Sequence, residues 1–156
     1  MTAYQIFILC FLISCSTWAI EVGETLPLLK FENQFEDSMT LSSRTQLIFF
    51  ASDRESSKIM TEYLKETSTD PETYGAIYVA NTSKMPGLIF KMMALPKMRK
   101  LSFKIAIDRD GSLTKSWPHE ENKITLLELN QLKVQKVKYL NSKTDLSDLF
   151  KQLTKK

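Results

Sequence analysis

Two short clusters of acidic and hydroxyl side chains are the residues of this sequence best suited to chemistry. Residues 53–56 read Asp-Arg-Glu-Ser and directly follow an apolar run, and residues 108–112 read Asp-Arg-Asp-Gly-Ser. An aspartate at the end of a strand can act as a nucleophile in phosphoryl transfer, with Mg²⁺ held beside it. Asp53 or Asp108 would take this role in a Mg-dependent, phosphatase-like enzyme. For 108–112 a tight turn is the simpler interpretation, because few residues follow it to supply the lysine and further acids that such an enzyme needs.

Methionine side chains offer a second chemistry, because thioethers are suitable ligands for Cu(I). Four of them are concentrated in one stretch: Met85, Met92, Met93 and Met98. This stretch contains no cysteine or histidine, which are stronger copper ligands. Methionines at helical spacing also fill protein cores. We therefore expect a buried stripe that includes Leu88 and Ile89, with a Met-based copper-handling protein as an alternative.

Basic residues overlap the methionine stretch without any acidic neighbour. Between Lys91 and Lys104 there is no aspartate or glutamate, and the cations are Lys91, Lys97, Arg99, Lys100 and Lys104. Such a stretch can dock an acidic partner or an anionic membrane surface, or can be an ordinary solvated face. The net charge of the sequence is only +3, so we expect no nucleic-acid partner.

The elements that must position these residues follow from the apolar pattern. Residues 46–51 form a continuous apolar run of strand length, which is typical of a central strand covered by helices on both faces. Ser52 or Asp53 can cap the helix that follows, which we expect to run to about Glu66. Residues 74–80 predict a second buried strand. A strand, a helix and another strand in this order predict a βαβ unit.

The rest of the chain predicts further strands and helices. A helix is expected to begin near residues 81–83 and to end before Pro96. Residues 103–107 predict a strand, and the turn at 108–111 would return 112–117 antiparallel to it. The remaining elements are an N-terminal hairpin of 26–31 with 39–41, extended segments at 124–129 and 132–140, and a terminal helix at 144–153.

The N-terminal segment predicts export. Residues 6–13 are apolar, and no charged side chain precedes Glu21. Residues 17–19 fit a signal-peptidase cut before Ile20. The apolar stretch is too short to remain as a membrane anchor, so we expect no membrane span.

This processing defines the domain and the fate of its cysteines. We expect a signal peptide at 1–19 and one domain at 20–156, located in the periplasm or secreted. Alternatively, residues 12–15 fit a bacterial lipobox, which would make Cys15 the lipid anchor of a lipoprotein. Cys10 and Cys15 are the only cysteines, so neither processing route leaves a thiol pair in the domain. No cofactor is expected.

The order of the elements resembles that of the thioredoxin fold. Five segments resemble the sequence pattern of redoxin and peroxiredoxin-like proteins: residues 22–27, 34–35, 39–41, 47–52 and 105–113. This resemblance spans nearly the whole expected domain. It implies a thioredoxin-like, three-layer α/β sandwich with a mixed central sheet flanked by helices and an N-terminal β hairpin.

The resemblance also indicates a site that has lost its chemistry. Where a redoxin carries Cys-x-x-Cys, residues 54–57 read Arg-Glu-Ser-Ser, which cannot form a disulfide. The proline beside the disulfide in that family is also replaced, by residues 102–104. The expected binding surface is the edge of this former active site: Asp53, Arg54, Glu55, Ser56 and Ser57, with Ser102, Phe103 and Lys104 opposite.

The family fold without its thiols implies a function in binding. We expect an exported, redox-inactive domain that serves as a binding or accessory module in the cell envelope, with a protein partner. A fold shared with enzymes does not confer their activity. The phosphatase-like enzyme and the copper-handling protein remain the alternatives.

Overall fold

A seven-stranded mixed sheet forms the centre of the protein, whose computed structural model describes residues 19–155. The strands are β1 (Leu29–Glu32), β2 (Ser38–Leu41), β3 (Leu47–Ala51), β4 (Ala76–Asn81), β5 (Ala106–Asp108), β6 (Ile124–Asn130) and β7 (Lys133–Leu140). Their order across the sheet is β2-β1-β5-β4-β3-β6-β7. Strands β3, β4 and β5 are parallel, whereas β6 runs antiparallel to β3 and β1 antiparallel to β5. Residues 1–18 of the predicted signal peptide, with Cys10 and Cys15, lie outside the described residues.

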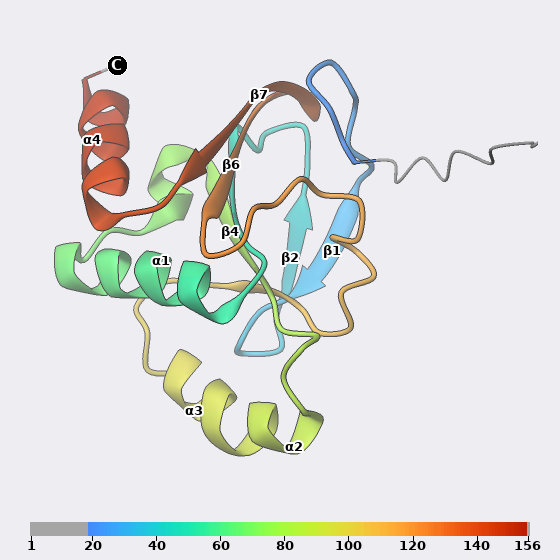
Figure 1. Cartoon of the computed structure of the whole chain (residues 1–156), viewed down its shortest axis with the longest axis vertical. Helices are drawn as coiled ribbons and strands as arrows, with labels where there is room; N and C mark the ends of the chain where they lie inside the picture. Colours follow the sequence, from blue (N-terminus) through green and yellow to red (C-terminus); the bar gives the residue numbers. More distant parts are fainter. Residues whose placement is uncertain (1–18, 156) are drawn as a thin grey trace, which may run out of the picture.

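Two long helices pack beside this sheet, and both begin at a capping box (Figure 1). Helix α1 (Arg54–Thr67) is capped by Asp53 and helix α4 (Lys143–Thr154) by Ser142, each of which accepts a hydrogen bond from the third helical residue. A short 3₁₀ turn, η1 (Pro71–Tyr74), leads into β4. The predicted mixed sheet flanked by helices is therefore confirmed.

A third helical segment projects from one end of the molecule, at the bottom of Figure 1. It consists of α2 (Gly87–Ile89), a π-helical turn η2 (Phe90–Ala94) and α3 (Leu95–Met98). The prediction that Pro96 ends this helix is wrong. A π turn precedes the proline, and in it the Leu95 amide donates a hydrogen bond to the carbonyl of Phe90. The helical segment therefore continues beyond Pro96 to Met98.

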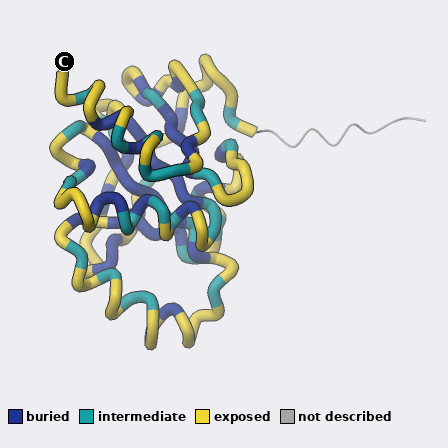
Figure 2. The backbone as a smooth tube through the Cα atoms, turned by 60° about the vertical axis from the view of Figure 1, so that its left-hand side comes forward, coloured by how far each residue is buried: buried dark blue, intermediate teal, exposed yellow. Residues whose placement is uncertain are grey.

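Two clusters of buried side chains lie on opposite faces of the sheet, because alternate residues of a strand point to opposite sides. Phe49 of β3 packs in the first cluster with residues of α1 and α4. Phe50 packs in the second, where Trp117 crosses it edge-on at 5.2 Å between ring centroids. Among the described helices, none contributes a buried residue to the second cluster. Loop residues such as Leu26 and Trp117 pack on this face, where the sequence predicted helices. Figure 2 shows that the buried residues, coloured dark blue, gather in the interior of the molecule.

The predicted return strand at 112–117 is wrong. Strand β5 lies between β1 and β4, so it has no free edge to which this segment could add. The chain instead winds into turns around the buried carboxylate of Asp108, which accepts hydrogen bonds from the amides of Gly111 (3.0 Å) and Thr114 (2.8 Å) and from the Thr114 hydroxyl (2.7 Å).

The predicted apolar stripe in the third helical segment is also not buried. Leu88 is 68% exposed, Met92 is 69% exposed, and Ile89 and Met93 are exposed as well. Phe90 is the buried residue of this segment, in the cluster shared with α1 and α4. Among residues 19–155, no helix combines the length and the apolar character needed to cross a bilayer.

Candidate functional site

The N-terminal tip of α1 is organised by Asp53. One carboxylate oxygen accepts a hydrogen bond from the Ser56 amide at 2.8 Å, and the other accepts from the Asn122 amide at 2.9 Å. The second contact joins the tip to the loop that precedes β6. Partial burial opposes ionisation of Asp53, but the bonds from Ser56 and Asn122 outweigh it and lower the pKa of this carboxyl.

The next four side chains differ in their access to solvent. Arg54 and Glu55 are exposed, and Ser57 is half-buried. Ser56 is buried, and its hydroxyl donates to Asp53, so its side chain cannot contact a partner directly. The hydroxyl of Ser57 lies 2.9 Å from that of Tyr78 in β4, and burial raises the pKa of this tyrosine.

A cavity of about 730 Å³ lies beside this tip. Its polar wall comes from the tip of α1 and the two residues before it, from the end of β4 and from the loop before β6. The polar residues are Ser52, Asp53, Arg54, Glu55, Ser57, Asn81, Thr82 and Asn122. Its other wall is mainly apolar and comes from the third helical segment and the chain leading into it: Met85, Pro86, Ile89, Met93, Ala94 and Met98. Lys84 and Lys97 add two cations. The cavity thus combines flexible apolar side chains with charges of both signs.

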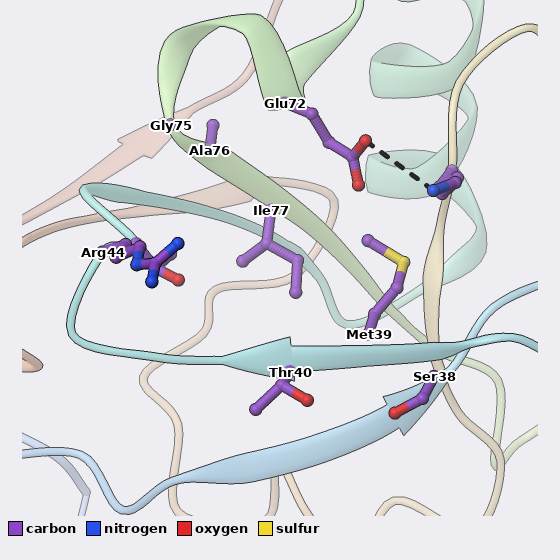
Figure 3. A pocket seen from close by; sticks show the side chains of 10 residues that line it. Ser38, Met39, Thr40, Arg44, Glu72, Gly75, Ala76 and Ile77 are labelled. Carbon is purple, nitrogen blue, oxygen red and sulfur yellow. Dashed lines mark ion pairs between the residues drawn. The ribbon is translucent and has the colours of Figure 1, made fainter.

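The structure does not bring all predicted site residues to this cavity. Phe103 is 2% exposed, and its ring lies 6.4 Å from that of Tyr78, so it packs inside the protein. Ser102 is exposed but does not line the cavity. Lys104 lines a different hollow of about 290 Å³, where it forms an ion pair with Glu72 at 4.0 Å (Figure 3).

A buried glutamine holds the segment that was predicted to lie opposite the tip. The Gln34 side chain donates to the carbonyl of Phe103 at 2.7 Å and accepts from the Ile105 amide at 2.9 Å. It thereby pairs main-chain groups just before β5 begins. Arg99 donates to the Gln34 carbonyl and forms an ion pair with Glu36, which ties the end of the third helical segment to the same turn.

Sequence reasoning missed the apolar wall and Asn122. The local pattern of Ile89 and Met93 at helical spacing is the same for a core helix and for a cavity wall. Asn122 contributes its main-chain amide, which carries no side-chain signal at all. Only the tertiary arrangement of two distant loops places it on Asp53.

The alternative chemistries find no support at these residues. Asp108 is buried and engaged by Gly111 and Thr114, and Asp53 acts as a helix cap. Within residues 19–155, no group of three or more His, Cys, Asp or Glu side chains could hold a metal ion. Three of the four methionines, Met85, Met93 and Met98, line the cavity, whereas Met92 does not.

Comparison with known proteins addresses the fold. No protein-family model matches the sequence, and no curated protein matches it. Solved structures resemble it over most of both chains, and three of them illustrate this likeness. Peroxidoxin BcpB from Mycobacterium tuberculosis has a TM-score of 0.57 at 14% identity, covering 86% of this chain and 97% of its own. The thioredoxin domain of a thiol-disulfide oxidoreductase from Bacteroides vulgatus has a TM-score of 0.53 at 11% identity, covering 86% of this chain and 98% of its own. A peroxiredoxin-like protein from Aquifex aeolicus has a TM-score of 0.56 at 10% identity, covering 88% of each chain.

The fold is thioredoxin-like. At these identities the likeness concerns the chain path alone, and it does not transfer the activity named for any of the three proteins. Residues 54–57 of this thioredoxin-like domain remain Arg-Glu-Ser-Ser, at the start of the helix that follows β3.

Proposed function

We propose that this thioredoxin-like domain is a redox-inactive binding or accessory module of the cell envelope. The cavity beside the tip of α1 would accept a segment of a protein partner. The observation that carries this proposal is the cavity itself, which opens at the start of the helix after β3 and is lined by Arg54 and Ser57 in place of thiols. Placement in the envelope rests on the apolar leader at 6–13.

The composition of the cavity supports a protein segment as the ligand. Methionine side chains can adapt to different apolar surfaces because they are unbranched and flexible. The charged groups Arg54, Glu55 and Lys97 at the same cavity can select a partner by complementary charge. The modest net charge of the chain argues against a nucleic acid.

Affinity capture from a cell-envelope extract, quantified by mass spectrometry, tests this proposal. We expect one or more proteins to be enriched by the unmodified domain and lost with Met93→Asp and with Arg54→Glu. Both side chains are exposed, so these variants should fold. Lys133→Glu on β7 changes an exposed charge that does not line the cavity and serves as the matched control.

Two results would contradict the proposal. The first is enrichment of the same proteins by the two cavity variants as by the control. The second is catalysed reduction of insulin disulfides by the unmodified domain, since this requires a thiol that residues 19–155 do not contain.

A further inference from the structure

The third helical segment has an outer ridge that does not belong to the cavity. Leu88 and Met92 are four residues apart and are the most exposed apolar side chains of the segment, at 68% and 69%. Neither lines the cavity, which instead receives Ile89 and Met93 from the same segment. The segment therefore presents one apolar face to the cavity and a second one to solvent.

The chain that carries the outer ridge has an excess of positive charge. No aspartate or glutamate occurs from residue 73 to residue 107. Arg99 and Lys104 form ion pairs with Glu36 and Glu72. The four remaining cations, all exposed, form no ion pair with any residue of 19–155: Lys84, Lys91, Lys97 and Lys100.

The ends of this segment are fastened to the body of the protein. At its start, the Arg109 guanidinium donates to the carbonyls of Thr82 (2.5 Å) and Met85 (2.7 Å) and lies 4.6 Å from the centre of the Phe90 ring. At its end, Arg99 binds the turn that holds Gln34. The ridge therefore lies on a fastened segment, and Figure 1 shows that this segment projects at one end of the molecule.

We propose that this ridge docks the domain on the surface of an anionic lipid bilayer. Exposed apolar side chains among lysines are the pattern of interfacial membrane binding, in which the apolar groups enter the headgroup region and the lysines contact anionic lipids. A projecting ridge can enter a soft surface, whereas a protein segment is bound best in a concave site such as the neighbouring cavity. The lysines of 73–107 that form no ion pair favour an anionic surface over a neutral one.

Co-sedimentation with vesicles measures this interaction. The protein is purified after expression of the full sequence, so that the leader is treated identically in every variant. We expect binding to vesicles of equal parts phosphatidylglycerol and phosphatidylcholine, and little binding to phosphatidylcholine alone. Raising the salt concentration should release the protein, because screening weakens the contact between lysines and lipid.

Charge and apolar variants separate the ridge from the rest of the molecule. Each lysine near the surface contributes roughly five-fold in affinity, so Lys91→Gln with Lys100→Gln should weaken partitioning about 25-fold. Lys133→Gln with Lys136→Gln removes the same charge from β7 and should leave partitioning to the vesicles nearly unchanged. Leu88→Gln with Met92→Gln should also reduce binding. Circular dichroism confirms that each variant is folded.

Several outcomes would overturn the proposal. Equal binding to neutral and anionic vesicles would remove the role of charge. An equal loss of vesicle binding in the β7 control would assign the binding to the net charge of the protein alone. If the unmodified protein does not bind anionic vesicles, the ridge is not a membrane-docking surface. Met93→Gln, which changes the cavity wall without changing the charge of the segment, should leave the anionic-vesicle preference intact, so the two proposals can fail separately.

Discussion

Asp53 connects two parts of the chain that are far apart in sequence. It caps α1 through Ser56 and holds the loop before β6 through Asn122. Both contacts favour the charged form, and they lower the pKa of the carboxyl below its usual value of 3.8 despite partial burial. A group whose pKa is lowered on folding stabilises the protein above its unfolded pKa and loses this contribution as the pH falls through its folded pKa.

We therefore expect a specific effect of Asp53→Asn on the pH dependence of stability. Asparagine still caps a helix, so the variant should fold and lose little at neutral pH beyond the charged hydrogen bonds. The loss of stability between pH 5 and pH 2 should be shallower than in the unmodified protein, roughly over the range in which an aspartate titrates. Urea unfolding across this pH range measures it, and identical slopes for both proteins would refute the assignment.

Gln34 is the other single residue on which the site region depends. Gln34→Leu leaves the Phe103 carbonyl and the Ile105 amide without their partner inside the protein. We expect the free energy of unfolding to fall by roughly 3 kcal/mol, since buried main-chain groups without partners are costly. The matched control is Gln152→Leu on the exposed face of α4, for which a change within about 0.5 kcal/mol is expected. Similar losses in both variants would contradict the role of Gln34.

At the scale of elements, α4 depends on one aromatic side chain. Phe150 stacks on Phe49 of β3 at 5.4 Å and on Tyr63 of α1 at 5.5 Å between ring centroids. It therefore joins the sheet and both long helices. Phe150→Ala should lower the free energy of unfolding by about 4 kcal/mol, because it opens a cavity between three elements.

Leu88→Ala provides the comparison for this experiment. It also removes a large apolar side chain, but from an exposed position, so a change within about 0.5 kcal/mol is expected. Chemical denaturation monitored by circular dichroism measures both variants. A loss for Leu88→Ala as large as that for Phe150→Ala would mean that the ridge is packed and not exposed.

The elements that could be predicted from the sequence are those with strong local signals. The apolar run of β3 and the capped helices α1 and α4 carry their own patterns, and the structure has them within a few residues of the predicted bounds. The segment 112–117 could not be predicted, because its pairing depends on whether β5 has a free edge. The exposure of Leu88 and Met92 could not be predicted either, because helical spacing of apolar residues does not show whether another element packs against them.

The same distinction applies to the candidate site. Residues 53–57 are contiguous and directly follow a buried strand, so the sequence alone identified them as a candidate site. Four of the five line the cavity, with Ser56 buried beneath them. Residues 102–104 were placed by analogy with a proline that this chain lacks, and their positions depend on Gln34, which lies about 70 residues away in sequence.

For the whole molecule, the described core contains no sulfur–sulfur bond, because residues 19–155 include no cysteine. Stability must therefore come from packing and hydrogen bonding. We expect the same Tm with and without dithiothreitol, measured by differential scanning calorimetry. A lower Tm in the reductant would mean that Cys10 or Cys15 takes part in a stabilising disulfide.

The strand order has a consequence for the integrity of the chain. Strands β1 to β4 precede the projecting helical segment and β5 to β7 follow it, yet β5 is inserted between β1 and β4, and β6 lies beside β3. If the chain were cut within that segment, the two fragments would stay associated through the β1–β5, β4–β5 and β3–β6 strand pairings. Separately produced halves should therefore complement each other, and the break would fall in the part of the protein that meets its surroundings.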